Sequence, residues 1–345
     1  MPAMNDLPKP SPEMLAALAA KAGPDGFIEL PDFVETALYH PQHGYYCKQQ
    51  ERVGKSPHSD FYTSVSLKEA FAEIVVEATC SLLETAKLAP ADTHWVELGA
   101  EPNGTLLDSQ QSPFKSVRAI GIGQEIEIPS PAVVFSNELF DAQTFRQVRF
   151  DGERWIEYGV KLDGQNLSWA PRAQASEEAS LYIEELPRDL PVGYTADLPT
   201  GARSLARFLL EKNWSGVFVA FDYGKTWHSI SADTPQGSAR AYYRHQQLPD
   251  ILQAPGAIDI THHICWDHLE NALQKASFRK LSLQSQEAFI VHRAPNFLQK
   301  AFDPTLPAFA PIRQKLKELM HPAMMGQKFQ ALSAIRCPED LLAQS

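Results

Sequence analysis

The sequence predicts an α/β fold built on a parallel sheet, and three observations support this prediction. Three short apolar runs, at 95–98, 117–122 and 132–136, follow one another with turn residues between them, as buried parallel strands do. A fourth run, at 216–224, is apolar up to Asp222 and is the best candidate for a central strand. The first run ends in an acid and a glycine-bounded loop, which is how an α/β nucleotide-binding domain presents its ligand crevice.

Length and composition narrow the class of protein. The 345 residues suggest one elaborated domain or two, and 44% hydrophobic with 21% charged residues is typical of a soluble globular chain. A net charge of -11 argues against a general nucleic-acid binder. No apolar run approaches the ~20 residues that span a bilayer. The amino-terminal residues resemble no export or import signal, and the four cysteines form no CxxC pair. We therefore expect a cytoplasmic protein with reduced thiols.

Helices are predicted before the first strand. Ser11 and Pro12 open a helix that should stop near Gly23, and a second short helix should run over 31–38. Ser66 and Glu69 have capping-box spacing ahead of an apolar pattern, which predicts a long helix over about 67–87.

The later part of the chain mixes patterns. Alternating apolar and polar residues over 143–170, broken by Asp-Gly pairs, predict antiparallel hairpins. Asp267 and Glu270 again have capping-box spacing. The remaining predictions are a helix at 199–213, a loop at 225–257, a helix from 267 to about 276, a strand or turn at 278–286 and mostly short helices beyond it.

The loop after the first strand, within 95–106, has the frame of a cofactor site. Glu97 and Gly99 stand at the strand's carboxyl end, and Gly104 stands where the next helix should begin. Between them, Ala100, Glu101, Pro102 and Asn103 replace the glycines that would let backbone approach a ligand closely. A capped turn between strand and helix is the plain alternative for this pattern.

Several segments together resemble the MidA-like branch of class I S-adenosylmethionine (SAM)-dependent methyltransferases, which includes a mitochondrial arginine methyltransferase that assists complex I assembly. In order they are ALYHPQHGYY (37–46), SDFYTS (59–64), VELG…GTL (96–106), SNELFDA (136–142), FDYG (221–224), GSARAYYRH (237–245) and DITHHICWDHL (259–269). HPAMMGQKFQAL (321–332) resembles the closing helix of that family. The resemblance spans nearly the whole chain.

The resemblance implies an α/β class I SAM-methyltransferase fold, which is Rossmann-like and has a seven-stranded sheet with helices on both faces. It adds an N-terminal helical extension and inserted antiparallel hairpins. We expect residues 1–90 to form the extension and a cofactor-covering segment, 91–300 the SAM-methyltransferase-like domain, and 301–345 a helical segment packed on it.

S-adenosyl-L-methionine is the cofactor that the resemblance implies. Glu97 would accept hydrogen bonds from its ammonium group, while Gly99 and Gly104 allow the turn. The remaining residues that the resemblance assigns to cofactor binding are Asp60, Tyr62, Thr105 and Asn137. Asp60 and Tyr62 would close the site over the cofactor, although Asp60 as a turn residue and Tyr62 as a core aromatic are equally good interpretations.

SNELFDA carries the most specific chemistry. Glu138 and Asp141 follow an apolar strand, so they should lie where the methyl group would point. Methylation of arginine requires a guanidinium nitrogen to expose a lone pair, and a carboxylate can hold the guanidinium and localise its charge on the other nitrogens. Glu138 and Asp141 are therefore the catalytic candidates. Alternatively, Asn137 and Asp141 cap the turn that follows.

Five residues are candidates for substrate binding. Asp222 and Tyr223 end a strand at the same edge, and Arg240 and Tyr242 lie in a loop that could contact a peptide. His263 matches a family histidine, although a satisfied structural histidine is the commoner case. We expect no metal, because no acid or thiol cluster accompanies His262, His263 and His268.

Two departures from the family pattern leave a second function open. The cofactor loop has one extra residue and lacks its middle glycine. The short 105–133 stretch leaves only Glu125 or Glu127 to replace the acid that normally bonds the ribose. The predicted function is protein arginine methylation, with a complex I subunit as the family-level partner. The alternative is a catalytically lost relative that acts as a protein-binding or assembly factor. Methylation of a small molecule is a weaker third prediction.

Overall fold

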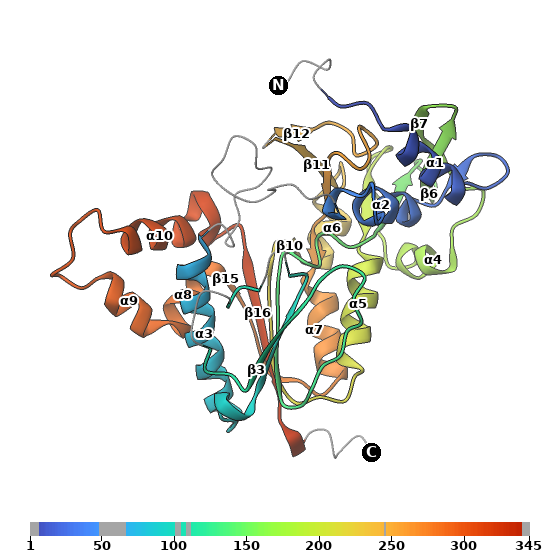
Figure 1. Cartoon of the computed structure of the whole chain (residues 1–345). Coiled ribbons are helices and arrows are strands. Elements are labelled where there is room, and N and C mark those ends of the chain that lie inside the picture. Colours follow the sequence, from blue (N-terminus) through green and yellow to red (C-terminus); the bar gives the residue numbers. More distant parts are fainter. Residues whose placement is uncertain (1–6, 48–66, 101–104, 108–111, 245, 340–345) are drawn as a thin grey trace.

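A computed structural model describes residues 7–47, 67–100, 105–107, 112–244 and 246–339. Its centre is a six-stranded sheet with the order β15-β16-β9-β4-β2-β3 (Figure 1). The strands are β2 (His94–Leu98), β3 (Ser116–Ile120), β4 (Ala132–Asn137), β9 (Gly216–Asp222), β15 (Arg279–Ser285) and β16 (Gln330–Arg336). β3, β2, β4 and β9 run parallel, and β16 is antiparallel to both of its neighbours.

The predicted α/β fold is confirmed, but the sheet has six strands among the described residues instead of seven. The short connection between β2 and β4 contains a single strand, β3, which pairs with β2 alone. A further strand with its own crossover would need a longer connection. β3 is consequently an edge strand, and its first three residues are exposed.

β9 is the central strand that its apolar run predicts, and all of its residues are buried. Val217, Val219 and Phe221 face one hydrophobic core, whereas Phe218 and Ala220 face another. The strand begins at Gly216 with φ +128°, where a Cβ would lie 1.9 Å from the carbonyl oxygen of Ala132. A parallel sheet of this kind must be covered on both faces.

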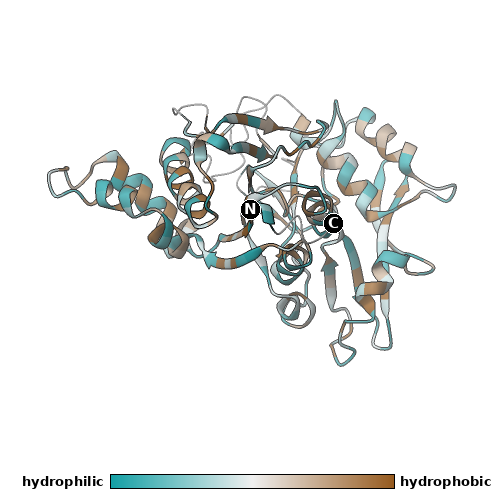
Figure 2. Cartoon of the chain, turned by 90° about the horizontal axis from the view of Figure 1, so that it is seen from below, coloured by the Kyte–Doolittle hydropathy of each residue, from teal (hydrophilic) through white to brown (hydrophobic). Residues whose placement is uncertain are grey.

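Helices cover both faces, as predicted (Figure 1). α3 and α8 lie on one face with α9 and α10 packed beside them, and α5 and α7 lie on the other. The helix ribbons are striped in teal and brown in Figure 2, because each helix turns its apolar side chains inward. Their bounds are α3 (Lys68–Thr85), α5 (Thr200–Leu210), α7 (Trp266–Lys275), α8 (Gln286–Arg293), α9 (Pro295–Ala301) and α10 (Pro311–Met320).

The predicted hairpins form a second, antiparallel sheet with the order β1-β6-β5-β8 and β7 paired to β6. The amino-terminal helices α1 (Pro12–Lys21) and α2 (Leu30–Tyr39) contribute to the core beside this sheet. Its strands are β1 (Phe27–Ile28), β5 (Arg146–Phe150), β6 (Trp155–Asp163), β7 (Asn166–Pro171) and β8 (Thr195–Leu198). α4 (Glu177–Ile183) follows β7.

Two sequence predictions about element type are wrong. The segment 225–257 was expected to be a loop, but it contains α6 (Trp227–Ala232) and strands that pair with later segments. These strands are β10 (Gly224–Lys225), β11 (Arg240–Tyr243) and β12 (Gln246–Leu248), with β13 (Asp259–Thr261) and β14 (Ile264–Cys265) as partners. The expected closing helix at 321–332 is a single π turn over Pro322–Gly326 followed by β16.

The capping box predicted for α7 does not form, and the one predicted for α3 includes a residue outside the described range. α3 begins after Leu67 without a side-chain cap, and Glu69 pairs with Lys315 at 2.8 Å, while Ser66 lies outside the described residues. In α7, Asp267 accepts a hydrogen bond from the backbone N–H of Trp227 at 2.5 Å. The Ser11 cap of α1 does form, since its hydroxyl accepts from Met14 N at 3.1 Å. Glu69 and Asp267 therefore bind residues that are distant in sequence, Lys315 and Trp227.

Candidate active site

The order of strands in the sheet changes direction at β2. A ligand crevice is expected at such a point. β3 adds on one side of β2, and the chain then crosses to add β4 on the other. In open α/β sheets, ligands bind outside the carboxyl ends of the strands at this switch point. Gly99 follows β2 there, and Asn137 and Glu138 lie at the end of β4.

The residues after β2 close a turn on themselves. Glu97 is buried, and one of its carboxylate oxygens accepts from the Thr105 hydroxyl and from Leu106 N, the latter at 2.6 Å. Burial raises the pKa of Glu97, and these two hydrogen bonds oppose that rise. Residues 105–107 form a turn where a helix was expected. In this structure Glu97 and Thr105 hold each other, which matches the alternative of a capped turn.

The position after β2 requires a glycine, Gly99, because its backbone is left-handed and its surroundings leave little room for a side chain. Its φ is +73°, and a Cβ there would lie 3.0 Å from Cδ1 of Leu139. Its N–H donates to the carbonyl of Ile120 at 2.9 Å, tying the ends of β2 and β3 together. Asp60, Tyr62 and Gly104, the other cofactor candidates in covering segment and loop, lie outside the described residues.

The turn after β4 is held from below by β9. Asp222 Oδ2 accepts from Phe140 N at 3.0 Å and from Asp141 N at 3.3 Å, and the Asp222 side chain is fully buried. Glu138 has the left-handed φ of +51°, and its N–H donates to Phe221 O at 2.9 Å. Asp222 was expected to bind substrate, but these bonds make it the support of the turn, with no exposed surface of its own.

Glu138 and Asp141, the two catalytic candidates, are both carried by this turn. The Asn137 side-chain amide donates to Glu138 Oε1 at 3.0 Å, so Asn137 orients Glu138. Asp141 is 2% exposed, and burial raises its pKa to about 6 even though the Tyr223 hydroxyl bonds it. Asp141 Oδ1 is buried with no hydrogen-bond partner among the described residues. A buried carboxylate oxygen without a donor is costly and points to a missing partner.

Three further residues form a wall that residue-level prediction missed. The Tyr39 hydroxyl donates to Ala142 O at 2.8 Å, and the Tyr46 hydroxyl donates to Asp259 Oδ1 at 2.8 Å. The Tyr39 and Tyr46 rings stack with centroids 5.5 Å apart, and burial together with the Asp259 charge raises both tyrosine pKa values. The segments 37–46 and 259–269 resembled the family, and this was the signal that could have drawn attention to these side chains.

The candidate substrate residues lie at the side of this wall. Arg240 donates to the carbonyl oxygens of Gly237 and Ala239, at 3.1 and 2.7 Å, and Tyr242 is half-buried opposite Asp259 in the β11–β13 ladder. Their segment is anchored by the buried carboxylate of Asp197, which accepts from Ala239 N at 2.7 Å. Tyr223, by contrast, reaches Asp141 directly.

His263 contacts Tyr223 in a T-shaped arrangement with ring centroids 6.2 Å apart. Burial and the nearby charges of Lys225 and Arg240 lower the His263 pKa to about 4, so the imidazole is neutral at physiological pH. Its Nδ1 is buried without a partner in the described chain. The ring is thus part of the site's wall and carries no charge to it.

The carboxyl end of β3 lacks the acid that would bond a ribose. Gly121 N donates to Gln124 Oε1 at 2.9 Å, and Glu125 is exposed. Glu127 turns back along the strand and pairs with Arg118 at 2.8 Å. Among the described residues, neither Glu125 nor Glu127 is therefore held at the carboxyl end of β3, where the resemblance places the acid that bonds the ribose.

Two further features concern the described residues alone. These residues contain no group of three or more histidine, cysteine, aspartate or glutamate side chains able to hold a metal ion. In the same part of the chain, no helix is both long and apolar enough to cross a membrane.

Comparison with known proteins identifies a family and two curated relatives. Residues 83–283 match the family described as "Putative S-adenosyl-L-methionine-dependent methyltransferase". The protein arginine methyltransferase NDUFAF7, mitochondrial, of Xenopus laevis is 22% identical over 93% of this chain and 84% of its own length. The Bos taurus protein of the same name is 24% identical over 97% and 85%.

Solved structures agree in fold. A Burkholderia thailandensis protein bound to S-adenosylhomocysteine superposes with a TM-score of 0.80, covering 96% of this chain and 95% of that one, at 24% identity. A native crystal structure from the same organism gives a TM-score of 0.77 with the same coverage and identity. The likeness therefore includes the amino-terminal helices and the antiparallel sheet as well as the central sheet.

Proposed function

This chain belongs to the family of S-adenosyl-L-methionine-dependent methyltransferases, and we propose that its acceptor is an arginine side chain of a protein. SAM is its methyl donor and supplies an electrophilic methyl group. One observation carries the choice of acceptor: Asp141, buried and with one oxygen lacking a partner, stands one turn from Glu138 at the end of β4. The names of the curated relatives support the same choice.

The chemistry follows from these two carboxylates. A guanidinium is cationic and planar, and it matches a carboxylate with two parallel N–H donors. Held by Glu138, its charge would concentrate on the bonded nitrogens, leaving the third nitrogen free to attack the methyl group. That nitrogen must lose a proton after methylation. A carboxylate whose pKa lies near 6, as that of Asp141 does, is suited to take it at neutral pH.

Tyr223 and Asn137 position the two acids. The Tyr223 hydroxyl bonds Asp141, and the Asn137 amide bonds Glu138 at 3.0 Å. The left-handed backbone of Glu138 is supported by its N–H bond to Phe221 O. Strained backbone held by its surroundings is common at catalytic sites.

The test uses the full chain, tritiated SAM and a pool of arginine-containing peptides, with acid hydrolysis to identify the methylated amino acid. We expect radioactive methylarginine. Methyl groups found only on another amino acid or on a small molecule would overturn the choice of acceptor. Calorimetric binding of SAM without any transfer would favour the alternative of a protein-binding factor.

Glu138→Gln separates the two halves of the site. It should leave SAM affinity nearly unchanged and lower turnover about 100-fold or more, because the amide cannot localise the guanidinium charge. A loss of SAM affinity would place Glu138 in the cofactor half instead. A complex I subunit as the substrate and a cytoplasmic location stay predictions, and both curated relatives carry "mitochondrial" in their names.

A further inference from the structure

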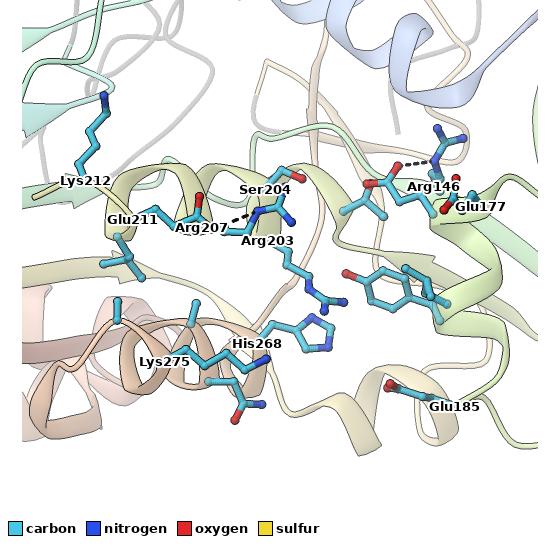
Figure 3. A pocket seen from close by; sticks show the side chains of 18 of the residues that line it. Arg146, Glu177, Glu185, Arg203, Ser204, Arg207, Glu211, Lys212, His268 and Lys275 are labelled. Atoms are coloured by element: carbon cyan, nitrogen blue, oxygen red, sulfur yellow. Dashed lines mark hydrogen bonds and ion pairs between the residues drawn. The ribbon is translucent and has the colours of Figure 1, made fainter. Parts of the chain in front are cut away.

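A groove of about 1340 Å³ lies between α4, α5 and α7, away from the active site (Figure 3). Within the described chain, none of the residues that line it belongs to the candidate active site. Its volume exceeds the roughly 300–1,000 Å³ of ordinary small-molecule pockets. The groove therefore has room for a second ligand.

One end of the groove gathers hydrogen-bond donors from three helices. Tyr182 comes from α4, Arg203 from α5 and His268 from α7. The Tyr182 and His268 ring centroids are 5.4 Å apart, and the guanidinium carbon of Arg203 lies 5.4 Å from the Tyr182 ring centroid. Figure 3 shows the side chains of Arg203 and His268 directed toward one another across the groove.

Two of these donors lack acceptors. His268 Nδ1 is buried without a hydrogen-bond partner among the described residues. The Tyr182 hydroxyl oxygen accepts from Arg203, its own proton has no acceptor among the described residues, and the side chain is only 3% exposed. No carboxylate of the described chain forms an ion pair with Arg203, although Glu177 and Glu185 also line the groove. Two other arginines of the groove are already paired with glutamates: Arg207 pairs with Glu211 at 3.7 Å, and Arg146 pairs with Glu178 at 2.7 Å.

We propose that Tyr182, Arg203 and His268 bind an anionic group, a carboxylate or a phosphate, of a ligand that lies along this groove. A guanidinium binds either group through paired N–H donors, and a phenol hydroxyl adds a third donor. Lys275 also lines the groove, seven residues after His268 at the end of α7. Its ammonium group would meet a second negative group of the ligand. The site is independent of which acceptor the methyltransferase uses.

Trp227 lies close enough to the proposed anion site to report binding through its fluorescence. Its ring lies 5.3 Å from that of His268 and 5.5 Å from that of Tyr182. An anion at Arg203 should therefore change Trp227 fluorescence, and Trp227→Phe should abolish this change. The same anion should raise the pKa of His268, which burial and Arg203 now hold at about 4.

The test titrates the full chain with inorganic phosphate and, separately, with succinate at constant ionic strength. We expect saturable binding with a dissociation constant of about 1 mM or tighter. Arg203→Gln should weaken it about 10-fold or more, because a charge-assisted bond is lost. Arg154→Gln, at a surface arginine in the connection between β5 and β6, is the matched control and should change nothing.

Tighter binding of phosphate would assign a phosphate-bearing ligand, and tighter binding of succinate would assign a carboxylate. Arg203 is solvent-exposed, so its replacement should not disturb folding. The proposal is overturned if neither anion binds saturably, or if Arg203→Gln binds as the parent chain does.

Discussion

The molecule buries charge at both ends of its central sheet, and it treats the two charges differently. At the amino ends of the parallel strands, Arg336 is 1% exposed and donates to four carbonyl oxygens, of Leu210, Lys212, Trp214 and Ala276, at 2.6–3.2 Å. At the carboxyl ends, Asp141 is as deeply buried, yet one of its oxygens has no partner among the described residues.

This difference separates structure from function. The carbonyls that Arg336 bonds lie in and after the last turns of α5 and α7, where helix ends attract cations. Its guanidinium carbon also lies 4.6 Å from the Phe278 ring centroid. A charge so fully satisfied serves stability. A charge left incomplete, as on Asp141, costs stability and is retained where a ligand completes it.

The largest expected effect is at the satisfied charge. Arg336→Met should lower the free energy of unfolding by about 3–5 kcal/mol, because it leaves several buried carbonyls without donors. Urea unfolding followed by circular dichroism measures this. Arg207→Met, on the exposed surface of α5, is the control. A loss below about 1 kcal/mol would mean that water replaces the guanidinium easily.

At the unsatisfied charge we expect lost turnover without lost folding. Asp141→Asn should lower the rate of methyl transfer by about 100- to 1,000-fold, since it removes the carboxylate that accepts the proton from the methylated nitrogen. It should unfold at the same or a higher urea concentration at pH 8. Asp163→Asn, in an exposed hairpin turn, is the control for the rate. Retained turnover would reduce Asp141 to a cap of its turn.

The pH dependence of stability should differ between the parent and Asp141→Asn. The Asp141 pKa is about 6 in the folded chain, above the ordinary aspartate value of 3.8, so protonation favours folding. This contribution is complete below about pH 4 and is lost as pH rises through 6, by about 2–3 kcal/mol in total. Methyl transfer should show the opposite trend, with kcat/KM rising through the same range. Identical stability curves for the two proteins would contradict the shifted pKa.

The smallest effect concerns the crevice wall at Gly99. Gly99→Ala forces an L side chain to φ +73° and places its Cβ 3.0 Å from Leu139, so we expect a loss of about 1–2 kcal/mol. SAM affinity, measured by calorimetry, should fall as well, because Leu139 borders the turn that follows β4. Gly123→Ala, which has φ +74° but open space around it, isolates the backbone cost from the clash.

Sequence patterns predicted those elements whose burial follows from the order of apolar and polar residues within the element itself. β9 was evident because its apolar run needs no partner to explain it, and the hairpins were evident from alternation and Asp-Gly turns. β16 was missed, since Gln330–Arg336 mixes alanine and serine with few large apolar residues and its burial comes from β9 and β15. The family resemblance assigned roles to single residues of the candidate site, and those roles stay predictions.

Within the site, tertiary contacts decided the roles. Asp222 supports the turn of Glu138 through backbone N–H groups more than eighty positions away in sequence, and its contact with substrate stays a prediction. Glu97 closes its own loop through hydrogen bonds from Thr105 and Leu106, and its contact with the cofactor stays a prediction. No local pattern distinguishes a carboxylate that binds a ligand from one that accepts backbone donors. That distinction depends on which N–H groups the fold brings to it.

β16 also has a consequence for the order in which the protein is made. It is the last described strand in the chain, yet it lies between β9 and β15 in the sheet. Until residues 330–336 leave the ribosome, β9 and β15 therefore each expose an unpaired backbone edge, which is a template for aggregation. β9 and β15 become joined in one sheet only when β16 pairs with both of them. In a nascent chain halted before residue 330, β15 would have no partner strand and would stay separate from the β9-β4-β2-β3 part of the sheet.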